Sequence, residues 1–165
     1  MISRSSDKFN PFYVPEETLS LLTILTDFFS QREVVTYIVG GFLRDVLIGR
    51  ITSDIDLAVK GDAVSLARDL ANELGGTFVL LDEERGIARV VLVTKSRLHR
   101  ADVNPQDGLY KTVDLCGFTG DITVDLSRRD FTIDAMALPL DNVLYENLTS
   151  SNGELITENL VDPFN

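Results

Sequence analysis

The chain has 165 residues, 44% of them hydrophobic, a single cysteine and a net charge of −11. This composition is typical of one globular domain with a sizeable core, and the short apolar runs and polar N-terminus predict neither a membrane span nor a signal peptide. The acidic balance excludes a large RNA footprint on this chain, because proteins that cover nucleic acid carry basic patches.

The first part of the chain alternates helical and extended patterns. Residues 1–14 are expected to form a polar tail, and apolar residues at helical spacing predict a helix over 15–32. An apolar strand over 34–39, a short helix over 42–48 and a second strand over 54–59 follow. The pattern therefore predicts a strand, a short helix and a strand directly after the first helix.

The middle of the chain begins with Asp62, a residue type preferred at helix N-caps. It predicts a helix that runs to Leu74, where two glycines end it. Strands are then expected over 77–82, 87–94 and 97–103, the last two as a hairpin.

Glycine and proline give residues 104–120 the pattern of a loop, and residues 121–127 predict one or two helical turns. Residues 133–138 fit a helix or a strand equally well, while 142–156 fit a small hairpin. Together these elements predict an α+β fold, with a mixed sheet and helices packed against it.

Two aspartates on one predicted strand suggest a metal site. Asp54 and Asp56 are two residues apart, so their side chains leave the same face, roughly 7 Å apart at Cα. Neighbouring carboxylates repel each other unless a cation compensates them, and oxygen ligands suit Mg²⁺. Gly40 and Gly41 leave no side chain where the preceding strand turns into a helix, and their N–H groups could receive phosphate. Alone, either pair is common on protein surfaces or in turns.

The two pairs belong to a longer signature, Gly40-Gly41-x-x-Arg44-Asp45 followed by Asp54-x-Asp56. It resembles the first signature of the class II tRNA nucleotidyltransferase and bacterial poly(A) polymerase family, within the polymerase beta-like nucleotidyltransferase superfamily. The stretch from Arg128 to Ala137 resembles the family's next signature. The resemblance covers about Tyr37 to the C-terminus and implies the nucleotidyltransferase fold, with a mixed, roughly five-stranded sheet.

The resemblance implies a head (catalytic) domain over 15–165, without the neck, body and tail domains that follow it in the family. The implied activity is addition of nucleotides from CTP or ATP to an RNA 3′-end with two Mg²⁺ ions, with tRNA CCA addition favoured over poly(A) synthesis. Most of the RNA would be bound outside this chain. Two alternatives stay open: a small stand-alone nucleotidyltransferase acting on a protein or small molecule, and a metal–NTP binding module that is inactive without its neck.

The resemblance also implies roles for single residues. Asp54 and Asp56 would hold the metal ions, and Asp102 is the candidate third catalytic carboxylate, with an exposed strand acid as the alternative. Arg44 would contact the triphosphate or brace the acids. Asp45 would be structural, holding either Arg44 or a loop N–H.

The second signature would bind the incoming nucleotide through Arg128, Arg129 and Asp130, which otherwise fit a solvated helix end. Asp134 departs from the family, which usually carries Asn there, so a hydrogen-bond donor is lost. Cys116 allows no intrachain disulfide, fits a reducing cytoplasm, and is expected to be a small structural residue.

Overall fold

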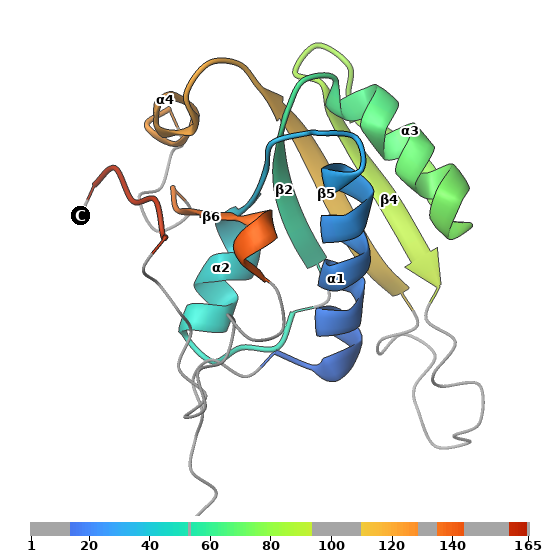
Figure 1. The fold of residues 1–165 in the computed structure, drawn as a ribbon, viewed down its shortest axis with the longest axis horizontal. Helices are drawn as coiled ribbons and strands as arrows, with labels where there is room; N and C mark the ends of the chain where they lie inside the picture. The colour runs from blue at the N-terminus through green and yellow to red at the C-terminus, as the bar shows by residue number, and fades with distance from the viewer. Residues whose placement is uncertain (1–13, 53, 94–109, 129–134, 144–158, 165) are drawn as a thin grey trace, which may run out of the picture.

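The computed structural model describes residues 14–52, 54–93, 110–128, 135–143 and 159–164. Its elements follow the chain as shown in Figure 1: α1 (Glu16–Ser30), β1 (Thr36–Val39), α2 (Gly40–Leu47), β2 (Asp54–Lys60), α3 (Ala63–Leu74), β3 (Thr77–Asp82), β4 (Ile87–Val93), β5 (Tyr110–Phe118), α4 (Ile122–Leu126), β6 (Ala137–Pro139) and a 3-10 helix, η3 (Leu140–Val143).

The described strands form one six-stranded sheet in the order β3-β4-β5-β2-β1-β6. The central strands β2 and β5 are parallel, and the other neighbouring strands are antiparallel. The predicted α+β class with a mixed sheet is confirmed, with one strand more than the five expected. Parallel pairing needs a long connection, and here α3, β3 and β4 lie between β2 and β5 in the chain.

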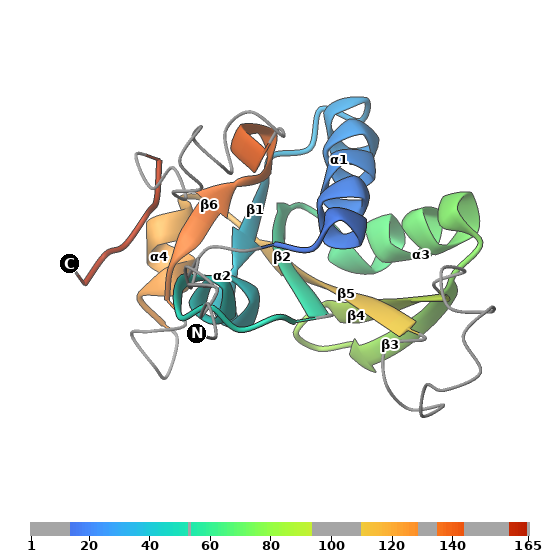
Figure 2. The ribbon, with the colours of Figure 1, turned by 90° about the horizontal axis from the view of Figure 1, so that it is seen from below.

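Helices α1 and α3 cover one face of the sheet, as Figures 1 and 2 both show. The main core lies between them and the sheet, and includes Leu22, Phe28, Leu57, Leu70 and Leu115. A smaller core on the opposite face joins α4 to β1, β2, β5 and β6. This second core covers only part of that face, and the polar residues described below lie beside it.

Most predicted elements before residue 94 are confirmed with small shifts at their ends. Asp62 caps α3 as expected, since its carboxylate accepts hydrogen bonds from the N–H groups of Val64 and Ser65, both at 3.1 Å. These bonds, with one from the Ser65 hydroxyl, lower the pKa of Asp62. Gly75 ends α3 at a φ of 65°, a left-handed conformation that favours glycine.

The prediction of a loop over 104–120 was wrong for residues 110–118, which form β5 in the middle of the sheet. The prediction interpreted the glycines of this segment as turn residues. Gly117 stands in this strand because a Cβ there would lie 2.7 Å from the carbonyl oxygen of Gly61. The glycine therefore reflects close backbone packing between β5 and the end of β2 rather than a turn.

The end of the chain is described in part. The helical turns predicted over 121–127 are confirmed as α4, and the undecided segment 133–138 contributes Ala137 and Leu138 to β6. The predicted strand over 97–103 lies outside the described residues, as does most of the predicted hairpin over 142–156. Among the described residues, each helix is too short or too polar to span a bilayer.

Candidate active site

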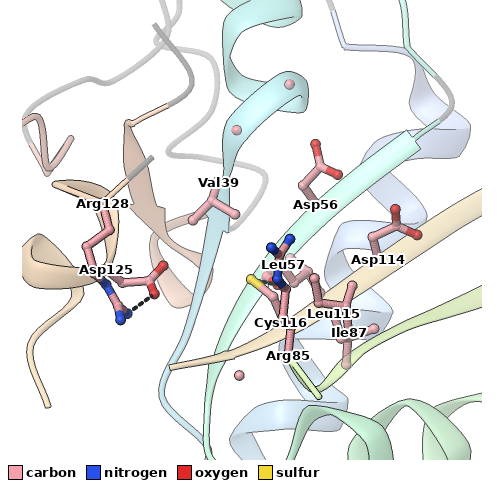
Figure 3. Close-up of a pocket in the computed structure, with 13 residues that line it drawn as sticks. Val39, Asp56, Leu57, Arg85, Ile87, Asp114, Leu115, Cys116, Asp125 and Arg128 are labelled. Atoms are coloured by element: carbon pink, nitrogen blue, oxygen red, sulfur yellow. Dashed lines mark hydrogen bonds and ion pairs between the residues drawn. The ribbon is translucent and has the colours of Figure 1, made fainter. Parts of the chain in front are cut away.

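Three aspartates lie on the face of the sheet opposite α1 and α3. Asp54 and Asp56 alternate along β2 with Ile55 and Leu57, which point into the main core. Asp114 lies on β5 directly beside Asp56 in the parallel register. Figure 3 shows the side chains of Asp56 and Asp114 on the same side of these two strands.

The glycine corner lies next to Asp56, as the sequence predicted. Gly40 begins α2 directly after β1, with a φ of 63°. A Cβ on Gly41 would lie 3.2 Å from Oδ2 of Asp56, and the N–H of Phe42 donates to the same oxygen at 3.3 Å. The start of α2 and the carboxylate therefore border the same space.

Arg44 lies on the same turn of α2. Its Nε donates to Oδ1 of Asp45 at 3.0 Å, so the expectation that Asp45 holds Arg44 is confirmed. The Nη2 atom of Arg44 lies 3.4 Å from the position of a Cβ on Gly41. The guanidinium of Arg44 and the carboxylate of Asp56 thus both border the space that a side chain on Gly41 would occupy.

Gly40, Gly41, Asp56 and Asp114 line a pocket of about 740 Å³, within the size range of small-molecule sites, whereas Asp54 and Arg44 are not among its lining residues. The opposite wall includes Arg128, whose Nη2 donates to Oδ1 of Asp125 in α4 at 2.8 Å (Figure 3). Cys116 also lines the pocket, with its Sγ 3.4 Å from the carbonyl oxygen of Leu57. Arg129, Asp130 and Asp134 lie outside the described residues.

Arg85 lines the pocket too. It belongs to a charged run, residues 83–85, whose pattern is typical of a solvent-exposed turn. Its N–H donates to Oδ1 of Asp82 at 2.9 Å, which fixes the turn between β3 and β4. The side chain rises from that turn into the pocket (Figure 3) and is 79% exposed. It therefore adds a second cation to the one at Arg128.

Asp114 is the carboxylate that the sequence interpretation missed, because it fell in the segment read as a loop. The predicted third acid, Asp102, lies outside the described residues. Asp114 is held by Arg89 of β4, which donates to both carboxylate oxygens, at 2.6 and 2.8 Å. These hydrogen bonds raise the pKa of Arg89, and burial opposes the shift. The alternation of Asp114 with Val113 and Leu115 was the signal that could have identified a strand.

The acids suit a hard divalent cation, since carboxylate oxygens are the ligands that Mg²⁺ prefers. Each acid is already engaged: Oδ1 of Asp54 accepts from Thr112 Oγ1 at 2.6 Å, Asp56 from Phe42, and Asp114 from Arg89. Within the described residues, no three such side chains are gathered closely enough to form a ready metal site. The carboxylates on the shared face of β2 nevertheless fit a divalent cation in their chemistry.

Comparison with known proteins identifies relatives for most of the chain. The profile of the poly A polymerase head domain matches residues 36–155. A CC-adding tRNA nucleotidyltransferase of Geobacter sulfurreducens is 42% identical over 102 residues, which is 62% of this chain and 21% of that protein.

Two solved structures share the fold. A Thermotoga maritima CCA-adding enzyme complexed with tRNA_CCA is 33% identical, with a TM-score of 0.62 over 81% of this chain and 29% of that one. A CCA-adding enzyme in complex with CTP is 29% identical, with a TM-score of 0.64 over 95% of this chain and 32% of that one. The chain thus spans less than a third of the length of each of these three relatives.

Proposed function

Since the chain belongs to the poly A polymerase head domain family, we propose that it is the catalytic head of an RNA nucleotidyltransferase that adds nucleotides from CTP or ATP to a tRNA 3′-end. The observation that carries the proposal is the placement of Asp56 beside both the Gly40-Gly41 corner and Asp114. An anion-binding helix start next to paired carboxylates suits a metal-bound triphosphate. The CC-adding and CCA-adding relatives favour tRNA over poly(A) synthesis.

Different residues in and around the pocket bind the metal ions and the phosphates. Asp54 and Asp56 hold Mg²⁺, with Asp114 as the third carboxylate. When bound, the metal ions would activate the attacking 3′-hydroxyl and stabilise the leaving pyrophosphate. The N–H groups at Gly40 and Gly41 receive phosphate oxygens, because the start of a helix presents N–H donors and a partial positive charge. Enzymes of this family generally use a divalent cation, and we propose Mg²⁺.

Two arginines orient the nucleotide from the far side of the pocket. Arg128 and Arg85 are both largely exposed and carry planar donors suited to phosphate and sugar oxygens. Asp125 fixes the guanidinium of Arg128 through their hydrogen bond. We also propose that Arg129 and Asp130 take part in nucleotide binding, as the second signature implies.

The tRNA is held mainly by residues outside this chain. The net charge of −11 is unfavourable for a large RNA contact. The matched part covers only 21% of the CC-adding relative and 29% of the Thermotoga maritima enzyme. We therefore propose that this chain supplies the chemistry in the cytoplasm, and that further domains bring the RNA end to it.

Calorimetric titration of the chain with CTP and with ATP tests the proposal directly. We expect saturable binding of both nucleotides in the presence of Mg²⁺ and loss of that binding when EDTA removes the metal. Transfer of radiolabelled nucleotide to a tRNA that lacks its 3′-terminal residues tests the reaction itself. Absence of nucleotide binding with and without Mg²⁺ would contradict the proposed function.

Replacing Arg85 with alanine is expected to weaken CTP binding about tenfold, the usual cost of losing a charged hydrogen bond. The fold should be unaffected, because the turn is held by the backbone N–H of Arg85, which the variant retains. Binding is measured by the same titration with CTP and with CMP. If Arg85 contacts the outer phosphates, its loss weakens CTP binding more than CMP binding.

The matched control is Arg68→Ala, which removes the same charge from α3, where the guanidinium lies over the ring of Phe78. This position lies on the face of the sheet away from the pocket, so CTP affinity should stay within about twofold of the original. An equal loss in both variants would show that only net charge matters, and would remove Arg85 from the site.

A further inference from the structure

Every acid of the site is held by a donor of the protein itself. Thr112 donates to Asp54 and the N–H of Phe42 donates to Asp56. The third acid, Asp114, accepts two hydrogen bonds from a cation, Arg89. Charge-assisted bidentate pairs are roughly twice as strong as neutral hydrogen bonds.

The pairing of Arg89 with Asp114 is built into the sheet. The two residues lie opposite each other in the antiparallel register of β4 and β5, and Asp114 is in turn beside Asp56 on β2. The side chains of Arg89 and Asp114 are only 38% and 23% exposed, so water weakens the pair less than it would at an open surface. Asp56 lies beside Asp114 on β2 and Asp54 on the same strand, so both carboxylates add negative charge near the guanidinium.

Such a pair opposes the binding of a metal ion. A divalent cation at Asp54 and Asp56 would attract the Asp114 carboxylate, but both oxygens of that carboxylate already face a guanidinium. The same guanidinium would repel the incoming ion. Arg89 is therefore in the position that a competing counter-ion would occupy.

We propose that Arg89 is a positioning residue that competes with the divalent ion for Asp114. The free protein then binds the ion weakly, and Asp114 becomes a metal ligand only when a nucleotide supplies further ligands. The inference rests on the proposed function, because it concerns the same metal site. It gives Arg89 a role beyond holding two strands together. Magnesium sites that act on nucleotides commonly take part of their ligands from the substrate phosphates.

The affinity for Mn²⁺ in the absence of nucleotide, measured by electron paramagnetic resonance, is the direct test. We expect Arg89→Met to bind Mn²⁺ about tenfold more tightly than the original chain, since a repelling charge is removed and Asp114 is released. A residue that only stabilised the sheet would not produce tighter binding. Arg89→Lys keeps the charge and a single contact, so its affinity should stay close to the original.

A double-mutant cycle separates competition from the general effect of charge. In an Asp114→Asn background, Arg89→Met should tighten Mn²⁺ binding by less than about threefold, because the released ligand is missing. An equal gain in both backgrounds, or no gain in either, would overturn the proposal. Arg68→Met on the opposite face is the charge control, and circular dichroism confirms that each variant is folded.

One further outcome concerns the site as a whole. If the original chain shows no Mn²⁺ binding that Asp54→Asn and Asp56→Asn abolish, the metal site of the proposed function is wrong, and the role of Arg89 is wrong with it. If that binding is present and Arg89→Met does not strengthen it, only the role of Arg89 is refuted.

Discussion

Replacing Asp56 with alanine is expected to reduce nucleotide transfer on the order of a thousandfold, about 4 kcal/mol of transition-state stabilisation. Asp56 is the acid that joins the glycine corner to Asp114: it borders Gly41, accepts from the N–H of Phe42 and lies beside Asp114. Its loss removes a metal ligand and also the group that fixes the metal against the phosphate-binding corner.

The fold should survive this substitution. The hydrogen bond that Asp56 accepts from the N–H of Phe42 is long, at 3.3 Å, and removing one of several neighbouring carboxylates relieves repulsion. The midpoint of thermal unfolding is therefore expected to stay within a few degrees of the original. Single-turnover transfer to a tRNA 3′-end gives the catalytic effect, and titration with CTP and Mg²⁺ gives the loss of metal-dependent binding.

Asp69→Ala provides the matched control, because Asp69 is an exposed aspartate of α3, on the other face of the sheet. It removes the same charge and should leave transfer and binding unchanged. If Asp56→Ala retained metal-dependent CTP binding and full transfer, Asp56 would not be a ligand and the proposed chemistry would be wrong.

The part of the site that the sequence predicted is the part that is local in the chain. Asp54 and Asp56 share a face because a strand has a period of two, and the glycine corner follows from the strand that ends at Val39. These features depend on residues a few positions apart. The turn-forming glycines and the spacing of the acids therefore sufficed to place two of the three carboxylates.

Asp114 could not be placed in this way, because its position depends on a register between strands 58 residues apart, such as Asp54 opposite Thr112. Local composition gave the wrong answer there, since Gly117 serves a contact with Gly61 that only the fold creates. The sequence interpretation assigned Arg85 no role in the site for a related reason. A charged run such as residues 83–85 is typical of a solvent-exposed turn, and only the fold shows that this turn borders the pocket.

Replacing Gly41 with alanine is expected to lower transfer by roughly tenfold to a hundredfold while the fold becomes no less stable. The added Cβ would lie 3.2 Å from Oδ2 of Asp56 and 3.4 Å from Nη2 of Arg44, so both groups must move by a few tenths of an ångström. Catalytic groups tolerate such displacements poorly. Gly41 lies inside α2 without a positive φ, where alanine is favoured over glycine by about 0.5–1 kcal/mol.

The opposite signs of the two effects make the test decisive, and Gly76→Ala supplies the contrasting control. A Cβ on Gly76 would lie 2.7 Å from Cδ2 of Leu92 and 2.9 Å from the carbonyl oxygen of Val91, so this variant should lose about 1–3 kcal/mol of stability through overpacking. Its binding of CTP at low temperature should be unchanged, since Gly76 does not line the pocket. A Gly41→Ala protein with unaltered transfer would show that the space beside Asp56 is not used by the reacting groups.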